Sequence, residues 1–514
     1  MLKNRSRTEY TLLNTLTGIG GYALNTVLGF LCRIVFTNCL SQHYLGVNGL
    51  FINLLGMLSL AELGIGSAIV YALYKPLAEH DEEKIASLVH LYGKAYRIIG
   101  TVVALVGLAL MPFLDVIIQD QPDIRESIYL LYGINLLNTA GTYFFSYRSS
   151  LIVAAQQNYI VSAVSYAVSI AQSILQMGIL LLTKNYLFYL LIQSVGILVN
   201  NLVVSHIAVK KFPCIKKKTV QPLPRKERKQ IFANVRDLTI YKISGLLVNS
   251  TDNILITFFD GLAVTGVASN YTMLVTTLDS LLAMLFNNLT ATIGNHNASE
   301  APEKRYDLFQ FLNMLNFWIF GWAALGIYFC STDLVRLFFG ETYVLPYEIP
   351  LIMALNFYAS GVTNIVRTYK HTMGLFRHGR FIQVFTGIVN IILSVLWGKL
   401  WGLFGILAAT LVARATTHLW CTPYVVYKYG FQKKVRHYWK TYAKYLLILL
   451  LAAAGCKLSF VLVTGSQLMQ TLLKILLCSV VTNGVFAVAL CRTKEFQKLK
   501  ERIRQILQML KHRT

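Results

Sequence analysis

Long apolar segments recur along the whole chain, with polar residues gathered in short stretches between them. A helix rises about 1.5 Å per residue, so an apolar run of roughly 20 residues crosses a hydrocarbon core of about 30 Å. The pattern predicts an all-α polytopic membrane protein with about fourteen transmembrane helices. Their expected positions are residues 11–37, 45–74, 88–111, 127–154, 159–183, 186–209, 230–258, 263–291, 307–330, 349–369, 380–397, 403–427, 440–463 and 468–491.

The composition agrees with this pattern. Of the 514 residues, 55% are hydrophobic and 14% are charged, and the mean hydropathy is +0.54. A water-soluble protein needs more polar residues to cover its surface. The eight cysteines are scattered singly, without the paired spacing of a metal site. We therefore expect free thiols that pack between helices, with no bound metal and no other cofactor.

Basic residues give the chain a net charge of +24, and their distribution predicts its orientation. The two tails and the connections from even to odd spans hold 37 of the 47 Lys and Arg residues, counting helix ends with their loops. The opposite connections hold only Arg125, Lys184, Arg336, Lys399 and Lys457. By the positive-inside rule, both termini are expected in the cytoplasm. Nucleic-acid binding would need these residues on one folded polar surface, so it is not expected.

A basic segment divides the chain into two similar halves. Residues 210–229 carry nine Lys and Arg, one Glu and three prolines, which is typical of a cytoplasmic linker. Aligning YLGVNGLF around Gly46 with VTGVASNY around Gly266 indicates a duplicated bundle. The expected organisation is an N-lobe (1–209, spans 1 to 6), the linker (210–229), a C-lobe (230–431, spans 7 to 12), spans 13 and 14 (432–491) and a basic tail (492–514).

The tail is predicted to form an amphipathic helix. Its apolar residues fall on one helical face, with Lys and Arg around the rest. These residues are Phe496, Leu499, Ile503, Ile506, Leu507 and Leu510. Such a helix could lie on anionic lipid headgroups or remain a solvated cytoplasmic helix.

Four stretches carry a resemblance to a known family. They are residues 44–81, 250–259 (STDNILITFF), 287–295 (NNLTATIGN) and 390–431. They resemble the polysaccharide transporter family of oligosaccharide-lipid flippases (Wzx-type), in the superfamily of the multidrug and toxin extrusion exporters and the lipid II flippases. The resemblance spans most of the chain to about residue 431.

The resemblance implies two pseudo-symmetric lobes around a central cavity that opens alternately to either membrane face. The implied cargo is an undecaprenyl-diphosphate-type glycolipid, moved from the cytoplasmic to the outer leaflet of a bacterial cytoplasmic membrane for capsule or O-antigen export. Polysaccharide assembly proteins are implied partners. An enzymatic activity is not expected.

Charged residues inside the spans are candidates for binding this cargo, because a charge in hydrocarbon is costly unless water or a partner reaches it. The cationic set would bind the diphosphate, since Arg forms bidentate contacts with phosphate oxygens. This set is Arg33, Arg148, Lys242, Arg367, Arg414 and His418. The alternative is that each arginine pairs with an acid or reaches an interface.

Three acids inside the spans are candidates for ion coupling or gating. Glu62, Asp252 and Asp279 could take up H⁺ or Na⁺ to reset the empty carrier, or they could simply balance the arginines. Arg33 and Asp252 fall at matching positions of the two repeats. We therefore predict that they pair across the outer gate.

Uncharged polar residues within the spans could hydrogen-bond sugar hydroxyls, although bonds between helices are the alternative for each residue. They include Asn25, Asn53, Asn135, Asn138, Gln172, Gln176, Asn200, Asn249, Asn313 and Asn316.

Three other functions compete with flipping. A membrane glycosyltransferase would need catalytic acids, but Asp115, Asp120 and Asp123 lie together in a short turn without a matching cluster. A scaffold without transport would pair all its buried charges. A cation-coupled multidrug exporter of related fold is the stronger alternative, and it would favour acids over arginines in its cavity.

Overall fold

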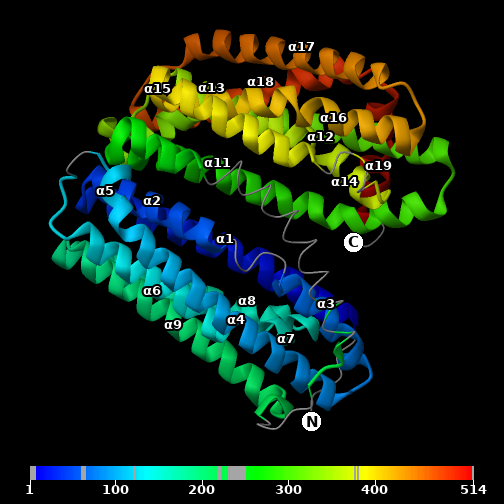
Figure 1. Cartoon of the computed structure of the whole chain (residues 1–514). Coiled ribbons are helices and arrows are strands. Elements are labelled where there is room, and N and C mark those ends of the chain that lie inside the picture. Colours follow the sequence, from blue (N-terminus) through cyan, green and yellow to red (C-terminus); the bar gives the residue numbers. More distant parts are fainter. Residues whose placement is uncertain are drawn as a thin grey trace. The chain divides into compact units, whose positions relative to one another are not determined.

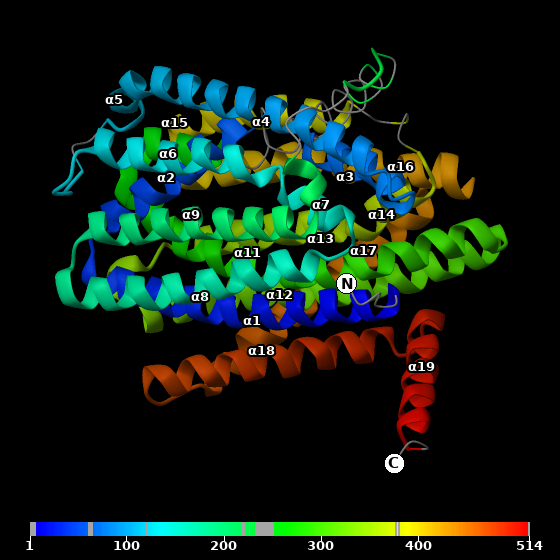
Figure 2. The same cartoon turned by 90° about the horizontal axis from the view of Figure 1, so that it is seen from below.

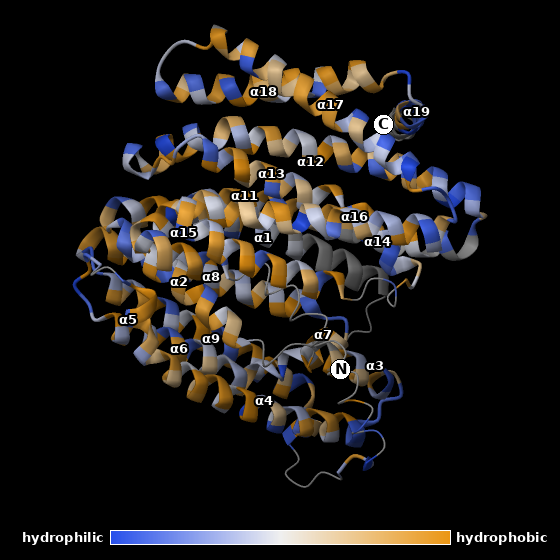
Figure 3. Cartoon of the chain, turned by 45° about the horizontal axis from the view of Figure 1, so that its top comes forward, coloured by the Kyte–Doolittle hydropathy of each residue, from blue (hydrophilic) through white to orange (hydrophobic). Residues whose placement is uncertain are grey.

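The computed structural model describes residues 7–59, 65–119, 122–216, 222–225, 227, 229, 231, 251–375, 378 and 381–511. Within these ranges the chain is helical and no β-strand occurs. Hydrophobic residues cover the middle of the long helices, and hydrophilic residues gather at helix ends and connections (Figure 3). The expected all-α fold is confirmed.

Many large apolar side chains lie on the surface. Leu105 is 61% exposed, Leu182 is 84% exposed and Val488 is 76% exposed. Extensive apolar surface is unfavourable in water but suits contact with lipid. Ten of the described helical segments are long and apolar enough to cross a membrane. The chain is therefore a multi-pass membrane protein.

The chain packs as two compact units, Met1–Gly266 and Val267–Thr514 (Figure 1). In the first unit, α1 packs on α8, α8 on α9, and α6 on both α4 and α9. Its helices are α1 (Arg7–Cys39), α2 (Gln42–Leu58), α3 (Ile65–Ala78), α4 (Glu82–Leu110), α5 (Leu114–Ile117), α6 (Ile128–Ser146), α7 (Ser149–Ala154), α8 (Asn158–Thr183) and α9 (Tyr186–Lys211), followed by a short 3₁₀ turn (Pro213–Lys216).

The second unit is built around α12, which contacts α13, α14, α17, α18 and α19. Aromatic side chains fill its core; Phe317, for example, stacks on Tyr445 with ring centroids 4.3 Å apart. Its helices are the part of α11 (Asp252–Ser299) that follows Gly266, then α12 (Pro302–Phe339), α13 (Glu348–Val362), α14 (Asn364–Thr372), α15 (Ile382–Thr416), α16 (His418–Val425), α17 (Arg436–Ser459), α18 (Gln467–Leu490) and α19 (Lys494–Lys511).

Helix α11 turns back on itself near its start. Gly261 leaves helical geometry with φ of 83°, a conformation that favours glycine. The Oγ1 atoms of Thr257 and Thr265 lie 2.9 Å apart across this turn. Residues eight positions apart lie about 12 Å apart along a straight helix, so the chain reverses here. The turn coincides with the expected boundary between spans 7 and 8.

Helix α15 contains a second helical hairpin. Gly402 has φ of 54°, and the Oγ1 atoms of Thr386 and Thr417 lie 2.6 Å apart on either side of it. Asn390 donates to Thr410 Oγ1 at 2.8 Å. This segment therefore supplies the two expected spans 11 and 12.

The remaining expected spans are broken or fall partly outside the described residues. Span 2 corresponds to α2 with α3, span 4 to α6 with α7, and span 10 to α13 with α14. Most of the expected span 7 lies outside the described residues. The described residues thus account for the expected spans other than most of span 7.

The division at Gly266 places the first part of α11 with the N-terminal helices. A close contact with α2 explains this. A Cβ added at Gly46 would lie 1.9 Å from the Leu262 carbonyl oxygen, and one added at Gly266 would lie 2.2 Å from the Gln42 carbonyl oxygen. Gly46 thus faces the backbone four residues before Gly266, and Gly266 faces the backbone four residues before Gly46. The predicted lobe boundary at the linker stays a prediction, because much of that region lies outside the described residues.

The tail helix α19 turns away from α18 and docks on α12 (Figure 2). Phe496 stacks on Trp318 with ring centroids 5.9 Å apart, and Lys498 forms a 3.1 Å ion pair with Asp307. The Arg502 guanidinium lies 4.7 Å from the centroid of the Phe311 ring. The first half of the tail therefore packs on its own unit. The side chains of Ile503, Ile506, Leu507 and Leu510 lie outside the described part.

Candidate functional site

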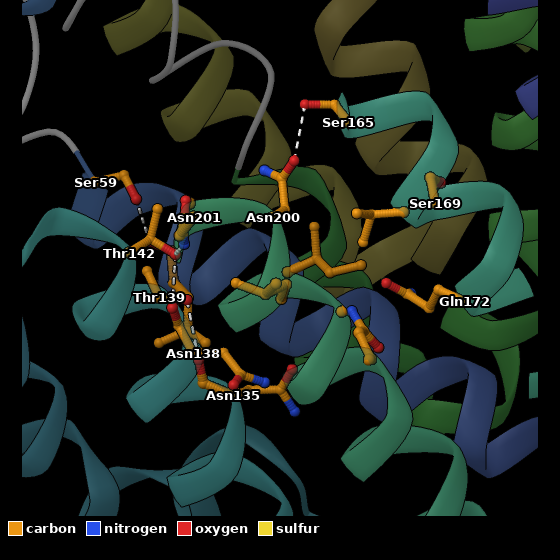
Figure 4. Close-up of a pocket in the computed structure, with 17 residues that line it drawn as sticks. Ser59, Asn135, Asn138, Thr139, Thr142, Ser165, Ser169, Gln172, Asn200 and Asn201 are labelled. Atoms are coloured by element: carbon orange, nitrogen blue, oxygen red, sulfur yellow. Dashed lines mark hydrogen bonds between the residues drawn. The ribbon is translucent and has the colours of Figure 1, made fainter. Parts of the chain in front are cut away.

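A polar pocket opens within the N-terminal unit, between α2, α6, α8 and α9 (Figure 4). Its volume is about 540 Å³, which is in the usual range for ligand pockets. Its lining combines amide and hydroxyl groups with apolar side chains and, within the described residues, includes no charged one. The lining residues are Ile52, Leu55, Gly56, Ser59, Asn135, Asn138, Thr139, Thr142, Ser165, Val168, Ser169, Gln172, Gln193, Gly196, Ile197, Asn200 and Asn201.

Hydrogen bonds between helices fix the orientation of several of these side chains. Asn138 donates to Ser194 Oγ at 2.8 Å. Asn201 donates to Thr142 Oγ1 at 3.3 Å, and Ser165 donates to Asn200 Oδ1 at 3.1 Å. Each of these hydrogen bonds uses only part of the hydrogen-bonding capacity of the Asn side-chain amide, which has two N–H donors and one acceptor oxygen. The pocket therefore presents preorganised amide and hydroxyl groups.

Four residues predicted to contact sugar, Asn135, Asn138, Gln172 and Asn200, line this pocket. A fifth, Asn25, accepts from the lining residue Ser169 at 2.6 Å. Asn316 shows the alternative role, because it donates from α12 to the Gly361 and Val362 carbonyls of α13. Asn53 donates to the Gly49 carbonyl of its own helix. Asn249 lies outside the described residues.

Sequence reasoning missed the smaller polar members of the pocket. Thr139 and Thr142 on α6, Ser165 and Ser169 on α8, and Asn201 on α9 all line it. Their spacing could have predicted them. Polar residues recur every three or four positions on each of these helices, and this spacing places them on one face.

The C-terminal unit brings together three cationic side chains, Arg367, Lys370 and Arg414, with the imidazole of His418; these four residues are here called the basic cluster. The positive charges of Arg367, Lys370 and Arg414 all act electrostatically on His418. All four side chains are half-buried. Three members of the predicted cationic set, Arg367, Arg414 and His418, thus lie together with Lys370.

Breaks between helices position the basic cluster. Arg367 and Lys370 belong to α14, which is separated from α13 at Thr363, and His418 begins α16 directly after Thr417. Discontinuous helices are common at transporter binding sites, because their ends present unpaired backbone groups.

Hydrogen bonds hold the two guanidinium groups in place. Arg414 Nη1 donates to the carbonyl of Asn356 in α13 at 3.2 Å, and Arg367 Nη2 donates to Asn364 Oδ1 at 3.4 Å. A guanidinium has five N–H donors, so such contacts can orient the group while others reach a ligand. The cluster can bind an anion with oxygen acceptors.

Arg33 lies elsewhere, in an aromatic region near the end of α1. Its charge acts on Tyr186 and Tyr189, and both rings lie against Phe36, with centroids 5.8 and 5.1 Å away. Glu126 also acts on Tyr186. This environment can stabilise a cation, but Arg33 and the basic cluster belong to different units.

Arg148 lies at the break between α6 and α7. Its Nη1 donates to Ser205 Oγ on α9 at 2.6 Å, and its Nε donates to the Tyr147 hydroxyl at 3.1 Å. It does not line the polar pocket. Glu62 and Lys242 lie outside the described residues.

The two described acids sit on α11. Asp252 is its first residue, and Asp279 lies mid-helix with an exposed side chain. Their roles in coupling, and the pairing of Arg33 with Asp252, stay predictions. Among the described residues, no group of three or more His, Cys, Asp or Glu side chains could hold a metal ion.

Comparison with known proteins identifies the family and the fold. Residues 12–290 match the family model described as "Polysaccharide biosynthesis protein". A lipid II flippase MurJ in an inward closed conformation superposes with a TM-score of 0.67 and 14% identity, over 93% of this chain and 99% of that one. An inward-facing multidrug resistance MATE family transporter of the MOP superfamily superposes with a TM-score of 0.61 and 14% identity, over 79% of this chain and 96% of that one. A search of curated proteins found no match to the sequence.

Proposed function

Because the chain belongs to the polysaccharide biosynthesis protein family, we propose that it is a flippase for a lipid-linked oligosaccharide. The cargo would be an undecaprenyl-diphosphate-type glycolipid, moved from the cytoplasmic to the outer leaflet of a bacterial cytoplasmic membrane for cell-surface polysaccharide export. Both termini would be cytoplasmic, and polysaccharide assembly proteins would receive the product. The fold shared with MurJ and MATE transporters supports alternating access as the mechanism.

The observation that carries this proposal is the separation of two kinds of polar group. The N-terminal unit holds the polar pocket, whose described lining residues carry no charge, and the C-terminal unit holds the basic cluster. A lipid-linked oligosaccharide has the same division: neutral hydroxyl groups on the glycan and a diphosphate with acceptor oxygens. Amides and hydroxyls suit the first, and arginines suit the second.

The role proposed for the basic cluster is binding of the diphosphate, and the role proposed for the polar pocket is binding of sugars. Arg33 provides a cationic contact nearer the outer face, late in transfer. Outward movement of an anion is favoured by an inside-negative potential, and so is inward return of the empty cationic site. Uptake of H⁺ or Na⁺ by Glu62, Asp252 or Asp279 would couple this return to an ion gradient.

The test is reconstitution of the purified protein in proteoliposomes with a fluorescent polyprenyl-diphosphate oligosaccharide. We expect the label to become accessible to a membrane-impermeant quencher faster than in protein-free vesicles. The same vesicles loaded with a lipophilic cationic dye measure multidrug export. Export of the dye without transfer of the glycolipid would contradict the flippase and support the multidrug exporter.

Removing hydrogen-bonding capacity from the polar pocket should impair transport of the glycan. For Asn138→Leu with Asn200→Leu we expect about 30-fold slower transfer, because each of the two lost bonds to cargo costs on the order of 1 kcal/mol. A cargo bearing one sugar instead of the full oligosaccharide should be slowed less. The same double substitution at Asn53 and Asn316, which bond to backbone outside the pocket, is the control. It should lower thermal stability without this dependence on glycan length.

A further inference from the structure

A second hollow in the N-terminal unit lies where α9 ends, and it combines basic and apolar side chains. Its volume is about 810 Å³. Four of its residues, Arg148, His206, Lys210 and Lys216, are basic and are here called the basic notch. The remaining lining residues are Phe145, Leu202, Val203, Ser205, Ile207 and Val209.

The basic notch opens on the face of α9 opposite the polar pocket. Successive residues of a helix are about 100° apart, so Ile197 and Asn200, which line the pocket, point away from Leu198 and Leu202. Leu198 is 50% exposed and Leu202 is 45% exposed. They belong to an apolar stripe that runs along α9 and ends at the notch. This stripe suits contact with lipid chains.

Arg148 is held rigidly at the inner wall of the notch. Its hydrogen bond to Ser205 reaches a side chain that is only 3% exposed, and its Nε is fixed by Tyr147. Two of the five N–H donors are used in this way within the described residues, so the others can meet an anion. His206, Lys210 and Lys216 are exposed, and the two lysines add flexible positive groups around it.

We propose that the basic notch binds the headgroup phosphate of an anionic phospholipid, with an acyl chain along the exposed stripe of α9. The lining contains four basic residues and no acid within the described part of the chain, so its charge complements a phosphodiester. A basic group at the end of a membrane helix lies at the depth of lipid headgroups. Arg148 therefore serves a resident lipid of the inner leaflet instead of the cargo diphosphate.

Native mass spectrometry of the purified full-length protein, with added phosphatidylglycerol or phosphatidylcholine, tests the proposal. The wild type should bind the first phosphatidylglycerol at least about tenfold more tightly than phosphatidylcholine. Lys210→Gln with Lys216→Gln should reduce this preference several-fold, and adding Arg148→Gln should abolish it. Lys399→Gln with Lys457→Gln removes two exposed lysines from predicted outer helix ends and should leave it unchanged.

The double variant keeps the test decisive even if Arg148→Gln disturbs the bond to Ser205, because Lys210 and Lys216 are exposed. An unchanged preference in the double variant would overturn the proposal. An equal loss of the lipid preference in the Lys399 and Lys457 control would also overturn it. Displacement of the lipid by inorganic phosphate at millimolar concentration would overturn it as well, since binding would then not depend on a lipid chain. The readout is binding, so it stands apart from the transport assay and from the identity of the cargo.

Discussion

Replacing both Arg367 and Arg414 with glutamine is expected to slow glycolipid transfer at least about 100-fold. Each substitution removes a charged donor in the basic cluster, and a hydrogen bond to a charged group contributes about 1.5–3 kcal/mol. Two such losses correspond to two or more factors of ten in rate or affinity. The measurement is the initial rate of quencher accessibility in proteoliposomes at matched protein density.

Matched variants separate a specific role from a general effect of charge. Arg436→Gln with Lys440→Gln removes two exposed positive charges at the start of α17 and should transport normally. Arg367→Lys with Arg414→Lys keeps the positive charges but loses the planar guanidinium groups that form bidentate hydrogen bonds, so an intermediate transfer rate is expected. Normal transfer by the glutamine pair, with unchanged thermal stability, would remove the basic cluster from the mechanism.

Replacing Gly46 with alanine is expected to lower the apparent melting temperature of the detergent-solubilised protein strongly. The new Cβ would lie 1.9 Å from the Leu262 carbonyl oxygen, and a backbone atom cannot move aside as a flexible side chain can. Overpacking usually costs 1–3 kcal/mol, and about 3 kcal/mol or more is expected here. Gly266→Ala, which faces the Gln42 carbonyl oxygen at 2.2 Å, should behave alike.

Gly178→Ala is the matched control for these substitutions. Gly178 lies inside α8, and a Cβ there meets no atom within 4 Å. Alanine at a helix interior is more favourable than glycine by about 0.5–1 kcal/mol, so this variant should melt at the same or a higher temperature. Equal melting of Gly46→Ala and Gly178→Ala would show that α2 and α11 do not pack this closely.

The positions of the helices followed from hydrophobic length because a bilayer imposes a fixed thickness on each span. The reversals at Gly261 and Gly402 fell where the sequence predicted boundaries between spans. The breaks at Thr363 and Thr417 were not predicted, since each lies inside one expected span (349–369 and 403–427). Packing against neighbouring helices decides whether such a helix runs on or breaks.

The sequence predicted the types of residue in the candidate site, but it predicted their positions only in part. Arg367 and Arg414 were identified as costly charges within spans, and the fold gathers them with Lys370 and His418. Arg148 had the same signature, yet it bonds to Ser205 and lines a hollow on the other face of α9. Whether Arg148 lines the polar pocket or the basic notch depends on which side of α9 it approaches. The sequence does not reveal this side, because Arg148 and Ser205 are 57 residues apart.

By itself, the sequence determined the membrane-spanning helices, the expected orientation and the chemical types available for binding, because these depend on local composition and on the bilayer. Only the tertiary structure decided which polar residues share a pocket and which cations form a cluster. Those groupings arise from contacts between helices that are distant along the chain, where the rotation of each helix about its axis selects the side chains that meet.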